Sequence, residues 1–268
     1  MSDAGVRVRL DLAYHGGAFV GWARQRSLRS VQGELERVLS LVVGQAVDVT
    51  AAGRTDSGVH ARGQVCHVDL PAGSELSVDR VNKALPEDIR VLALAKVSQD
   101  FDARFSALWR RYSYTVSDDP RGADPLLRHQ QLRVTQKLDL DAMNLSAKAL
   151  LGEHDFTSFC RVKEHGTRIR AVIDLHWDRQ SDPITGLDVA VMQVRADAFC
   201  HSMVRSFAGA LVPVGQGKKP IDHPKLALEM KSRDAGIPVY PAHPLVLEEV
   251  RYPPKDLWAL RQSQTRVS

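Results

Sequence analysis

The order of apolar and polar residues predicts both strands and helices in the first part of the chain. Residues 6–12 alternate strictly between apolar and polar side chains, which is typical of a strand with one buried face. From Val31 to Val42 the apolar residues recur at helical spacing, and Ser30 precedes them as the expected N-cap. Further elements are expected at residues 64–70 and 89–97 as strands, and at residues 78–85 as a short helix.

The second part of the chain repeats this mixture. Residues 167–177 alternate over a long run, and residues 188–196 are expected to pair with them as a hairpin. Other expected elements are strands at 111–117 and 245–250, and helices at 141–151, 204–211 (stopped by Pro213) and 226–230. The pattern predicts an α+β protein of two halves, residues 1–107 and residues 108–268.

Composition and charge narrow the functional classes. The chain has 268 residues, of which 44% are hydrophobic and 25% charged, so it is expected to form a globular core rather than a disordered or collagen-like chain. Lys plus Arg exceed Asp plus Glu by 36 to 32, and 26 of the 36 basic residues are Arg. Arginine's planar fork suits phosphate recognition, which favours a nucleic-acid partner, although a codon bias would give the same composition.

The cysteines and the first residues indicate the cellular compartment in which the protein is expected. Cys66, Cys160 and Cys200 are odd in number and far apart, which argues against a disulfide framework and fits a reducing compartment. No C-x-x-C pair suggests a zinc site, and no apolar run is long enough to span a membrane. The first residues carry an acid and no hydrophobic stretch, so no signal peptide is expected and the protein is expected in the cytoplasm.

One loop carries the strongest chemical signal. Residues 53–63 read Gly-Arg-Thr-Asp-Ser-Gly-Val-His-Ala-Arg-Gly, with three glycines that free the backbone. Asp56 stands two residues from Arg54, and a nearby cation would keep a nucleophilic carboxylate ionised. An Asx-turn, in which the aspartate caps its own loop, is the commoner use of such a residue, and local features alone leave both readings open.

A protease reading of the same loop fails on its chemistry. Asp56-Ser57-Gly58 matches the short aspartic-protease signature, but that reaction needs two carboxylates that share one proton. The chain holds one copy of the signature, its flanks are polar, and an arginine beside the dyad would oppose the shared proton.

The segment from Gly53 to Ala61 closely resembles the active-site loop of the tRNA pseudouridine synthase A family. Further matches follow in the family's order at Gly21–Trp22, Ser30–Glu36, Leu85–Ile89, Phe101–Ser106, Arg110–Tyr114, Gly152–Phe159, Phe199–Arg205 and Pro241–His243, with Leu245 and Leu247. The resemblance covers roughly residues 6–253. Several matches in order are far more specific than any single tripeptide.

The resemblance implies a fold and a function. The fold would be that of the pseudouridine synthases, with two ferredoxin-like or RRM-like α+β halves that share a central antiparallel sheet. Helices would cover its outer face, and a basic cleft would bind RNA. The implied activity is that of an RNA isomerase, which converts uridine to pseudouridine at nucleotides 38, 39 and 40 of the tRNA anticodon stem-loop. It would need no cofactor or metal and would act as a homodimer on tRNA.

The resemblance also assigns roles to residues. Asp56 would be the nucleophile, Tyr112 would stack on the uracil or take its C5 proton, and Arg205 would keep Asp56 ionised. The implied substrate-binding residues are Arg54, Leu245 and Leu247, together with the phosphate-contact candidates Arg24, Arg26, Arg29, Arg62, Arg168 and Arg170. By spacing alone an ordinary core or surface strand tyrosine is the better reading of Tyr112. The two leucines also fit a strand core, and the arginines fit a solvated surface.

The chain departs from the family pattern at three positions, and one rival class remains. Ala23 replaces a usual glutamine, while Pro244 and Val246 stand where Gly and Tyr are common. These residues bear on RNA contacts and on packing near Leu247. The rival is a tRNA-binding protein or RNA chaperone without turnover, which would not need Asp56, Tyr112 and Arg205 together.

Overall fold

The computed structural model describes residues 5–161 and 167–266, and the chain divides into two compact units. The first unit comprises Met1–Arg110 and Leu247–Ser268, and the second comprises Arg111–Val246. Residues 247–268 were predicted to belong to the second half. They lie in the first unit because their aromatic residues pack there: the Trp258 ring meets Phe101 at 4.9 Å between centroids, and the Tyr252 hydroxyl donates to the carbonyl of Ala103 at 2.7 Å.

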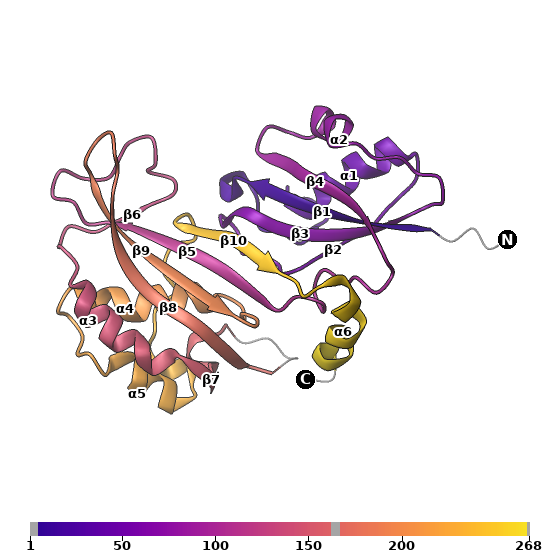
Figure 1. Cartoon of the computed structure of the whole chain (residues 1–268). Coiled ribbons are helices and arrows are strands. Elements are labelled where there is room, and N and C mark those ends of the chain that lie inside the picture. The colour runs from indigo at the N-terminus through magenta and orange to yellow at the C-terminus, as the bar shows by residue number, and fades with distance from the viewer. Residues whose placement is uncertain (1–4, 162–166, 267–268) are drawn as a thin grey trace. The chain divides into compact units, whose positions relative to one another are not determined.

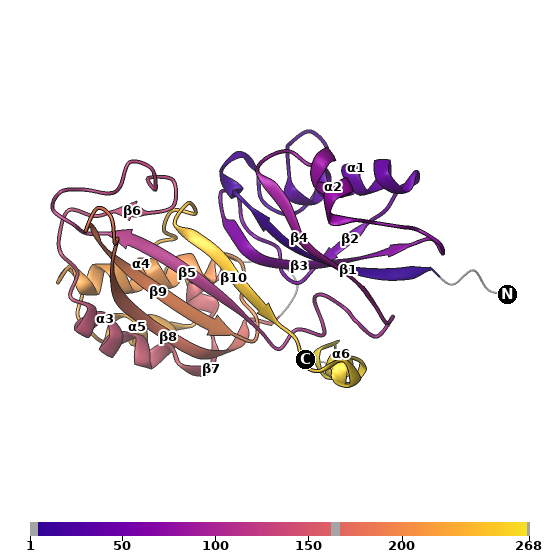
Figure 2. The same cartoon turned by 45° about the horizontal axis from the view of Figure 1, so that its top comes forward.

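The first unit is a sheet with two helices on one face (Figures 1 and 2). Its elements are β1 (Val6–Tyr14), α1 (Val31–Val43), β2 (Val49–Ala51), β3 (His60–Leu70), α2 (Val78–Ala84), β4 (Ile89–Val97), most of β10 (Leu245–Arg251) and α6 (Trp258–Arg266). The strand order is β4-β1-β3-β10, and β2 also pairs with β3. Strand β1 runs antiparallel to both of its neighbours.

The inward-facing apolar residues of β1 and the apolar face of α1 form the core of this unit. Val8, Leu10, Leu12 and Tyr14 point inward from β1 and are buried. The Ser30 hydroxyl accepts a hydrogen bond from the Gly33 amide at 3.2 Å, which confirms the expected N-cap of α1.

The second unit is also a sheet with helices. Its elements are β5 (Trp109–Ser117), β6 (Leu132–Arg133), α3 (Leu140–Ala147), β7 (Gly152–Asp155), β8 (Ile169–Ser181), β9 (Asp188–Ala196), α4 (Met203–Gly215) and α5 (His223–Met230). The strand order is β5-β9-β8-β7, and β8 and β9 form the expected antiparallel hairpin. Helices α3, α4 and α5 pack against one another beside these strands (Figure 1). Single 3₁₀ turns occur at Gly16–Ala18, Lys148–Leu150, Thr157–Phe159, Arg233–Ala235 and Lys255–Leu257.

The α+β class predicted from the sequence is confirmed, with two differences in detail. Strand β6 pairs with β5 in parallel, so the sheet is mixed rather than wholly antiparallel. Helix α4 continues through Pro213 to Gly215, although a proline lacks the N–H for the helical ladder and its ring crowds the preceding turn.

Two of the cysteines form a disulfide, contrary to the expectation from their spacing. Cys160 follows a 3₁₀ turn and Cys200 precedes α4, and the fold brings their Cα atoms to 5.7 Å. The neighbouring Arg161 amide donates to the His201 carbonyl at 2.9 Å, so the two segments are also joined through their backbones. Two cysteines that are far apart in the sequence can still form a disulfide when the tertiary fold brings them together. Cys66 is a free thiol in β3, and its burial raises its pKa.

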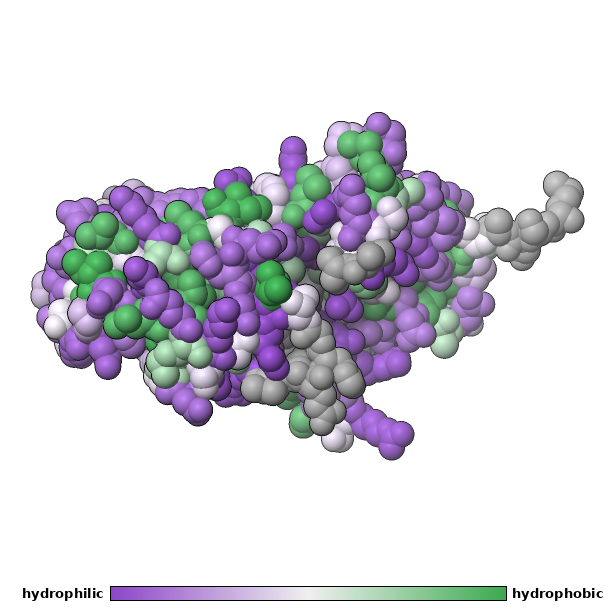
Figure 3. All heavy atoms as spheres, turned by 90° about the horizontal axis from the view of Figure 1, so that it is seen from below, coloured by the Kyte–Doolittle hydropathy of each residue, from purple (hydrophilic) through white to green (hydrophobic). Residues whose placement is uncertain are grey.

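The surface seen in Figure 3 is mostly hydrophilic, with small groups of hydrophobic side chains among the polar ones. Within the described residues, no helix has both the length and the apolar composition needed to cross a bilayer.

Candidate active site

The loop that carries Asp56 closes the hairpin between β2 and β3. The Ala52 amide donates to the Val65 carbonyl at 2.8 Å, which extends the pairing of the two strands to the start of the loop. At its far end the Val59 amide donates to the Asp56 carbonyl at 3.2 Å. Thr55 is buried and Asp56 is half-buried, so the carboxylate lies between the core and the surface.

A second loop, residues 15–30, braces the first. The Trp22 amide donates to the Thr55 carbonyl at 3.0 Å, and the Ser57 hydroxyl donates to the Phe19 carbonyl at 3.2 Å. Gly21 lies against the Asp56 loop with φ at +110°, a conformation that L side chains rarely adopt. The backbones of the two loops therefore touch with no room for a side chain at position 21.

Arg29 anchors this bracing loop from inside the unit. Its guanidinium donates to both carboxylate oxygens of Asp88, at 2.6 and 2.8 Å, and lies 4.3 Å from the centroid of the Phe19 ring. The hydrogen bond from Arg29 is the main reason that the pKa of Asp88 is lowered. Arg29, expected among the phosphate contacts, thus forms a partly exposed ion pair within the unit.

Tyr112 lies on β5 in the second unit with 8% of its surface exposed. Its ring meets Phe199 edge to face, with 5.1 Å between centroids. The next inward residue on the strand, Tyr114, donates its hydroxyl to the Pro241 carbonyl at 3.1 Å. Burial raises the pKa of Tyr114, and the positive charge of Arg205 partly opposes that rise.

Arg205 is the third residue of α4 and is half-buried, whereas the residues on either side of it are buried. Its Nε donates to the Tyr240 carbonyl at 2.7 Å, and the Tyr240 amide donates back to the Arg205 carbonyl at 3.2 Å. The helix starts after Ser202, a non-glycine residue at φ +66°. Such strain is more frequent at functional sites than elsewhere.

The expected site residues are distributed over both units. Asp56, Arg54 and Leu247 belong to the first unit, and Tyr112, Arg205 and Leu245 to the second. Leu245 and Leu247 are buried in β10, with 5% and 0% of their surfaces exposed.

The arginines proposed as RNA contacts differ in their present partners. Arg24 pairs with the buried Glu36 at 3.0 Å and with Asp48 at 3.4 Å, while Arg62 pairs with Glu248 at 2.6 Å. A phosphate contact would have to compete with these pairs. Only the Arg24–Asp48 pair is exposed on both sides, and such a pair is worth about 0–1 kcal/mol. The remaining candidates are on the surface: Arg26 and Arg54 are exposed, and Arg168 and Arg170 are half-exposed.

Two features of the site were not predicted from the sequence. Phe199 packs against Tyr112, although it lies within a segment already matched to the family. Tyr14 and Gln64 contact the Asp56 loop from the core, where each looks like an ordinary strand residue. The only signal was the presence of a polar group at an inward-facing position.

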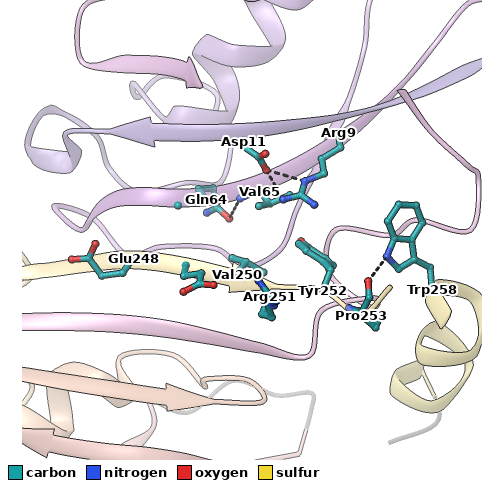
Figure 4. Close-up of a pocket in the computed structure, with 12 residues that line it drawn as sticks. Arg9, Asp11, Gln64, Val65, Glu248, Val250, Arg251, Tyr252, Pro253 and Trp258 are labelled. Carbon is teal, nitrogen blue, oxygen red and sulfur yellow. Dashed lines mark hydrogen bonds and ion pairs between the residues drawn. The ribbon is translucent and has the colours of Figure 1, made fainter. Parts of the chain in front are cut away.

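A separate hollow of about 360 Å³ lies in the first unit beside β10 (Figure 4). Arg9 pairs with Asp11 at 2.8 Å on its wall and lies 5.0 Å from the centroid of the Tyr252 ring. Its lining carries charges of both signs, which selects no single class of ligand. Among the residues that the structure describes, no cluster of three His, Cys, Asp or Glu side chains could hold a metal ion.

Comparison with known proteins gives a consistent result. Residues 146–253 match the profile of the tRNA pseudouridine synthase family. The chain is 50% identical to tRNA pseudouridine synthase A of Streptomyces griseus, over 97% of this chain and 93% of the relative. It is 48% identical to the enzyme of the same name from Frankia casuarinae, over 100% and 97%, and 47% identical to that of Cutibacterium acnes, over 97% and 94%. Identity at this level over nearly the whole length shows that the chain belongs to the tRNA pseudouridine synthase A family.

Proposed function

We propose that the protein isomerises uridine to pseudouridine at nucleotides 38, 39 and 40 of the tRNA anticodon stem-loop, with Asp56 as the nucleophile. Uridine isomerisation in the anticodon region of tRNA is the activity of the family to which the chain belongs. The observation that carries the proposal is 50% identity over 97% of the chain, a span that leaves no room for a replaced catalytic segment.

The reaction breaks one glycosidic bond and forms another. The Asp56 carboxylate attacks the ribose, the N1–C1′ bond breaks, and the uracil leaves with the electron pair. The base then turns within the pocket, and its C5 bonds to C1′ as the bond between Asp56 and the ribose breaks and the carboxylate is released. The C5 proton is then lost and N1 takes up a proton. Atoms and charge balance without an added reagent. A base must be out of the helix for this chemistry, so the nucleotide is flipped.

Three further residues support this reaction in the proposal. Tyr112, whose ring meets Phe199 edge to face, stacks on the uracil or takes its C5 proton. Arg205 pairs with Asp56 and keeps it ionised, since a neighbouring cation lowers a carboxyl pKa. Leu245 and Leu247 pack against the base, and Arg54 holds the flipped nucleotide through its phosphate.

The proposal extends to the RNA-binding surface and the assembly. The two units share a central sheet, and a basic cleft across it receives the anticodon stem-loop. Arg24, Arg62, Arg168 and Arg170 contact phosphates there, and the protein acts as a homodimer in the cytoplasm. The excess of arginine supports phosphate binding.

The alternative is a tRNA-binding protein or RNA chaperone that binds without turnover. Turnover, and not tRNA affinity, distinguishes this alternative from the enzyme. Purified protein is incubated with a tRNA transcript whose uridines carry tritium at C5, and tritium released to water is measured. Mapping of pseudouridine in the product then locates the modified nucleotides. Release with modification at 38–40 is expected. Tight tRNA binding by folded protein without release would favour the alternative.

The ion pair has its own test. Arg205→Ala removes the cation and is expected to shift the acid limb of the pH–rate profile to higher pH, because a carboxylate that loses a neighbouring cation is harder to ionise. An unchanged acid limb would refute the pairing of Arg205 with Asp56.

A further inference from the structure

Three buried polar groups beneath the Asp56 loop form a connected chain of hydrogen bonds. The Tyr14 hydroxyl lies 2.9 Å from the Thr55 hydroxyl, and the Gln64 side-chain amide donates to the Tyr14 oxygen at 3.2 Å. The same amide donates to the Gly53 carbonyl at 2.8 Å. Tyr14, Thr55 and Gln64 are 4%, 7% and 0% exposed, so water does not compete for these bonds.

The direction of these bonds follows from the chemistry of the groups. Gln64 donates into the Tyr14 oxygen, so the phenol keeps its own proton for the Thr55 hydroxyl. Burial raises the pKa of Tyr14 to about 12, and the phenol therefore remains a donor at neutral pH. The Gln64 side-chain oxygen accepts from the Val65 amide at 3.2 Å, which fixes the orientation of its amide group.

The strand pairing aims these side chains at the loop. Leu12 pairs with Gln64, but Tyr14 pairs with Ala61, so the register between β1 and β3 shifts between these two pairs. Such an irregularity re-aims side chains and is common near functional sites. The polar ends of Tyr14 and Gln64 consequently meet loop residues 53 and 55.

We propose that Tyr14 and Gln64 are positioning residues, which fix Gly53 and Thr55 and thereby present the adjacent Asp56 carboxylate to the ribose in one place. This inference rests on the proposed role of Asp56 as nucleophile and deepens it. Sheet stability does not require these polar groups, because the backbone ladder joins β1 and β3 without them and an apolar side chain of similar volume would fill the same space.

The expected consequence is a loss of turnover without a loss of RNA binding. The loop contributes the attacking atom, and a misplacement of about 1 Å costs about a hundredfold in rate. None of the network side chains is itself a proposed phosphate contact. The side chain of Arg54 is exposed, whereas those of Tyr14 and Gln64 are buried beneath the loop, so the KM for tRNA is expected to stay nearly constant.

The test uses matched variants of the full chain and single-turnover tritium release from C5-labelled tRNA. Tyr14→Phe removes only the phenol oxygen, and Thr55→Val removes the hydroxyl at constant shape, whereas Thr55→Ser retains it. The control is Tyr252→Phe, which removes another tyrosine hydroxyl bond of the first unit, a partly buried one to the Ala103 carbonyl at 2.7 Å, away from the loop.

We expect Tyr14→Phe and Thr55→Val to lower kcat by about ten- to a hundredfold, with KM within twofold of the wild type. Thr55→Ser should recover most of the rate, and Tyr252→Phe should turn over normally. Wild-type kcat in folded Tyr14→Phe would overturn the inference, as would an equal loss in Tyr252→Phe.

Two further comparisons keep the inference testable. If Tyr14→Phe does not fold, the comparison of Thr55→Val with Thr55→Ser decides, and equal rates for the two refute the inference. Asp56→Asn is measured in parallel. Full turnover in that variant would remove the proposed nucleophile and this inference together, whereas an inactive Asp56→Asn with a fully active Tyr14→Phe would refute the positioning role alone.

Discussion

Gly21→Ala provides a quantitative test of the contact between the two loops. A Cβ at position 21 would lie 2.8 Å from the Thr55 carbonyl oxygen and 3.1 Å from the Ser57 amide nitrogen. Real Cβ atoms essentially never lie within 3.0 Å of another atom and ordinary contact begins at 3.4 Å, so the catalytic loop and its bracing loop must move apart by 0.2 to 0.6 Å. The backbone conformation at φ +110° adds about 1–3 kcal/mol of strain. Loss of the Trp22 amide bond to Thr55 adds about 1 kcal/mol.

Gly21→Ala is therefore expected to lower the free energy of unfolding by about 2–4 kcal/mol. It should also lower kcat, because Asp56 moves with Thr55. Urea unfolding measures the first effect and single-turnover tritium release the second. The matched control is Gly44→Ala, at the end of α1: φ is +82°, and no described atom lies within 4 Å of the added Cβ. Its cost should be only the strain, about 1–2 kcal/mol, with normal turnover.

The reasoning fails if Gly21→Ala turns over like the wild type and loses no more stability than Gly44→Ala. That result would mean that the loop tolerates displacement, and that its position does not govern the reaction.

Three other predictions concern pH, the disulfide and salt. Burial lowers the pKa of His67, whose Nδ1 accepts a hydrogen bond from the Ala103 amide at 3.0 Å. The unfolded histidine therefore binds its proton at a higher pH than the folded one. The free energy of unfolding should consequently fall as the pH drops below about 6.5. His67→Asn, which keeps an acceptor, should flatten this part of the urea-measured profile, and an unchanged slope would contradict the assignment. Cys160→Ala should lower the free energy of unfolding by up to about 4 kcal/mol, because the bond to Cys200 closes a long loop. A reductant should destabilise the wild type by the same amount and leave the variant unchanged. If the reductant destabilised both proteins to the same extent, the bond would be excluded. The logarithm of tRNA affinity should fall with the logarithm of salt concentration by several charges, and Arg54→Ala should reduce that slope by about one; a flat salt dependence would place RNA binding elsewhere.

Long, regular elements could be predicted from the sequence alone. Strands β4 and β9 have the predicted bounds, because their alternation continues from one turn to the next. Strands β2, β6 and β7 have only three, two and four residues, too few to establish a period. Their pairing is decided by the neighbouring strands, which a local pattern does not contain.

The residues of the candidate site also differ in whether the sequence alone could identify them. Asp56 could be identified because the informative residues of its loop are contiguous. Tyr14 and Gln64 could not, because their hydrogen bonds to Thr55 and Gly53 join positions up to 41 residues apart. The same limit explains the disulfide: Cys160 and Cys200 are 40 positions apart, and only the tertiary fold brings them into contact.

The most direct test of the proposed chemistry is tritium release by Asp56→Asn, measured beside its tRNA affinity. Formation of the C5–C1′ bond must break the C5–H bond, so release reports the isomerisation itself. The account predicts no release above background, with tRNA affinity within several-fold of the wild type. Release at the wild-type rate would show that Asp56 is not the nucleophile.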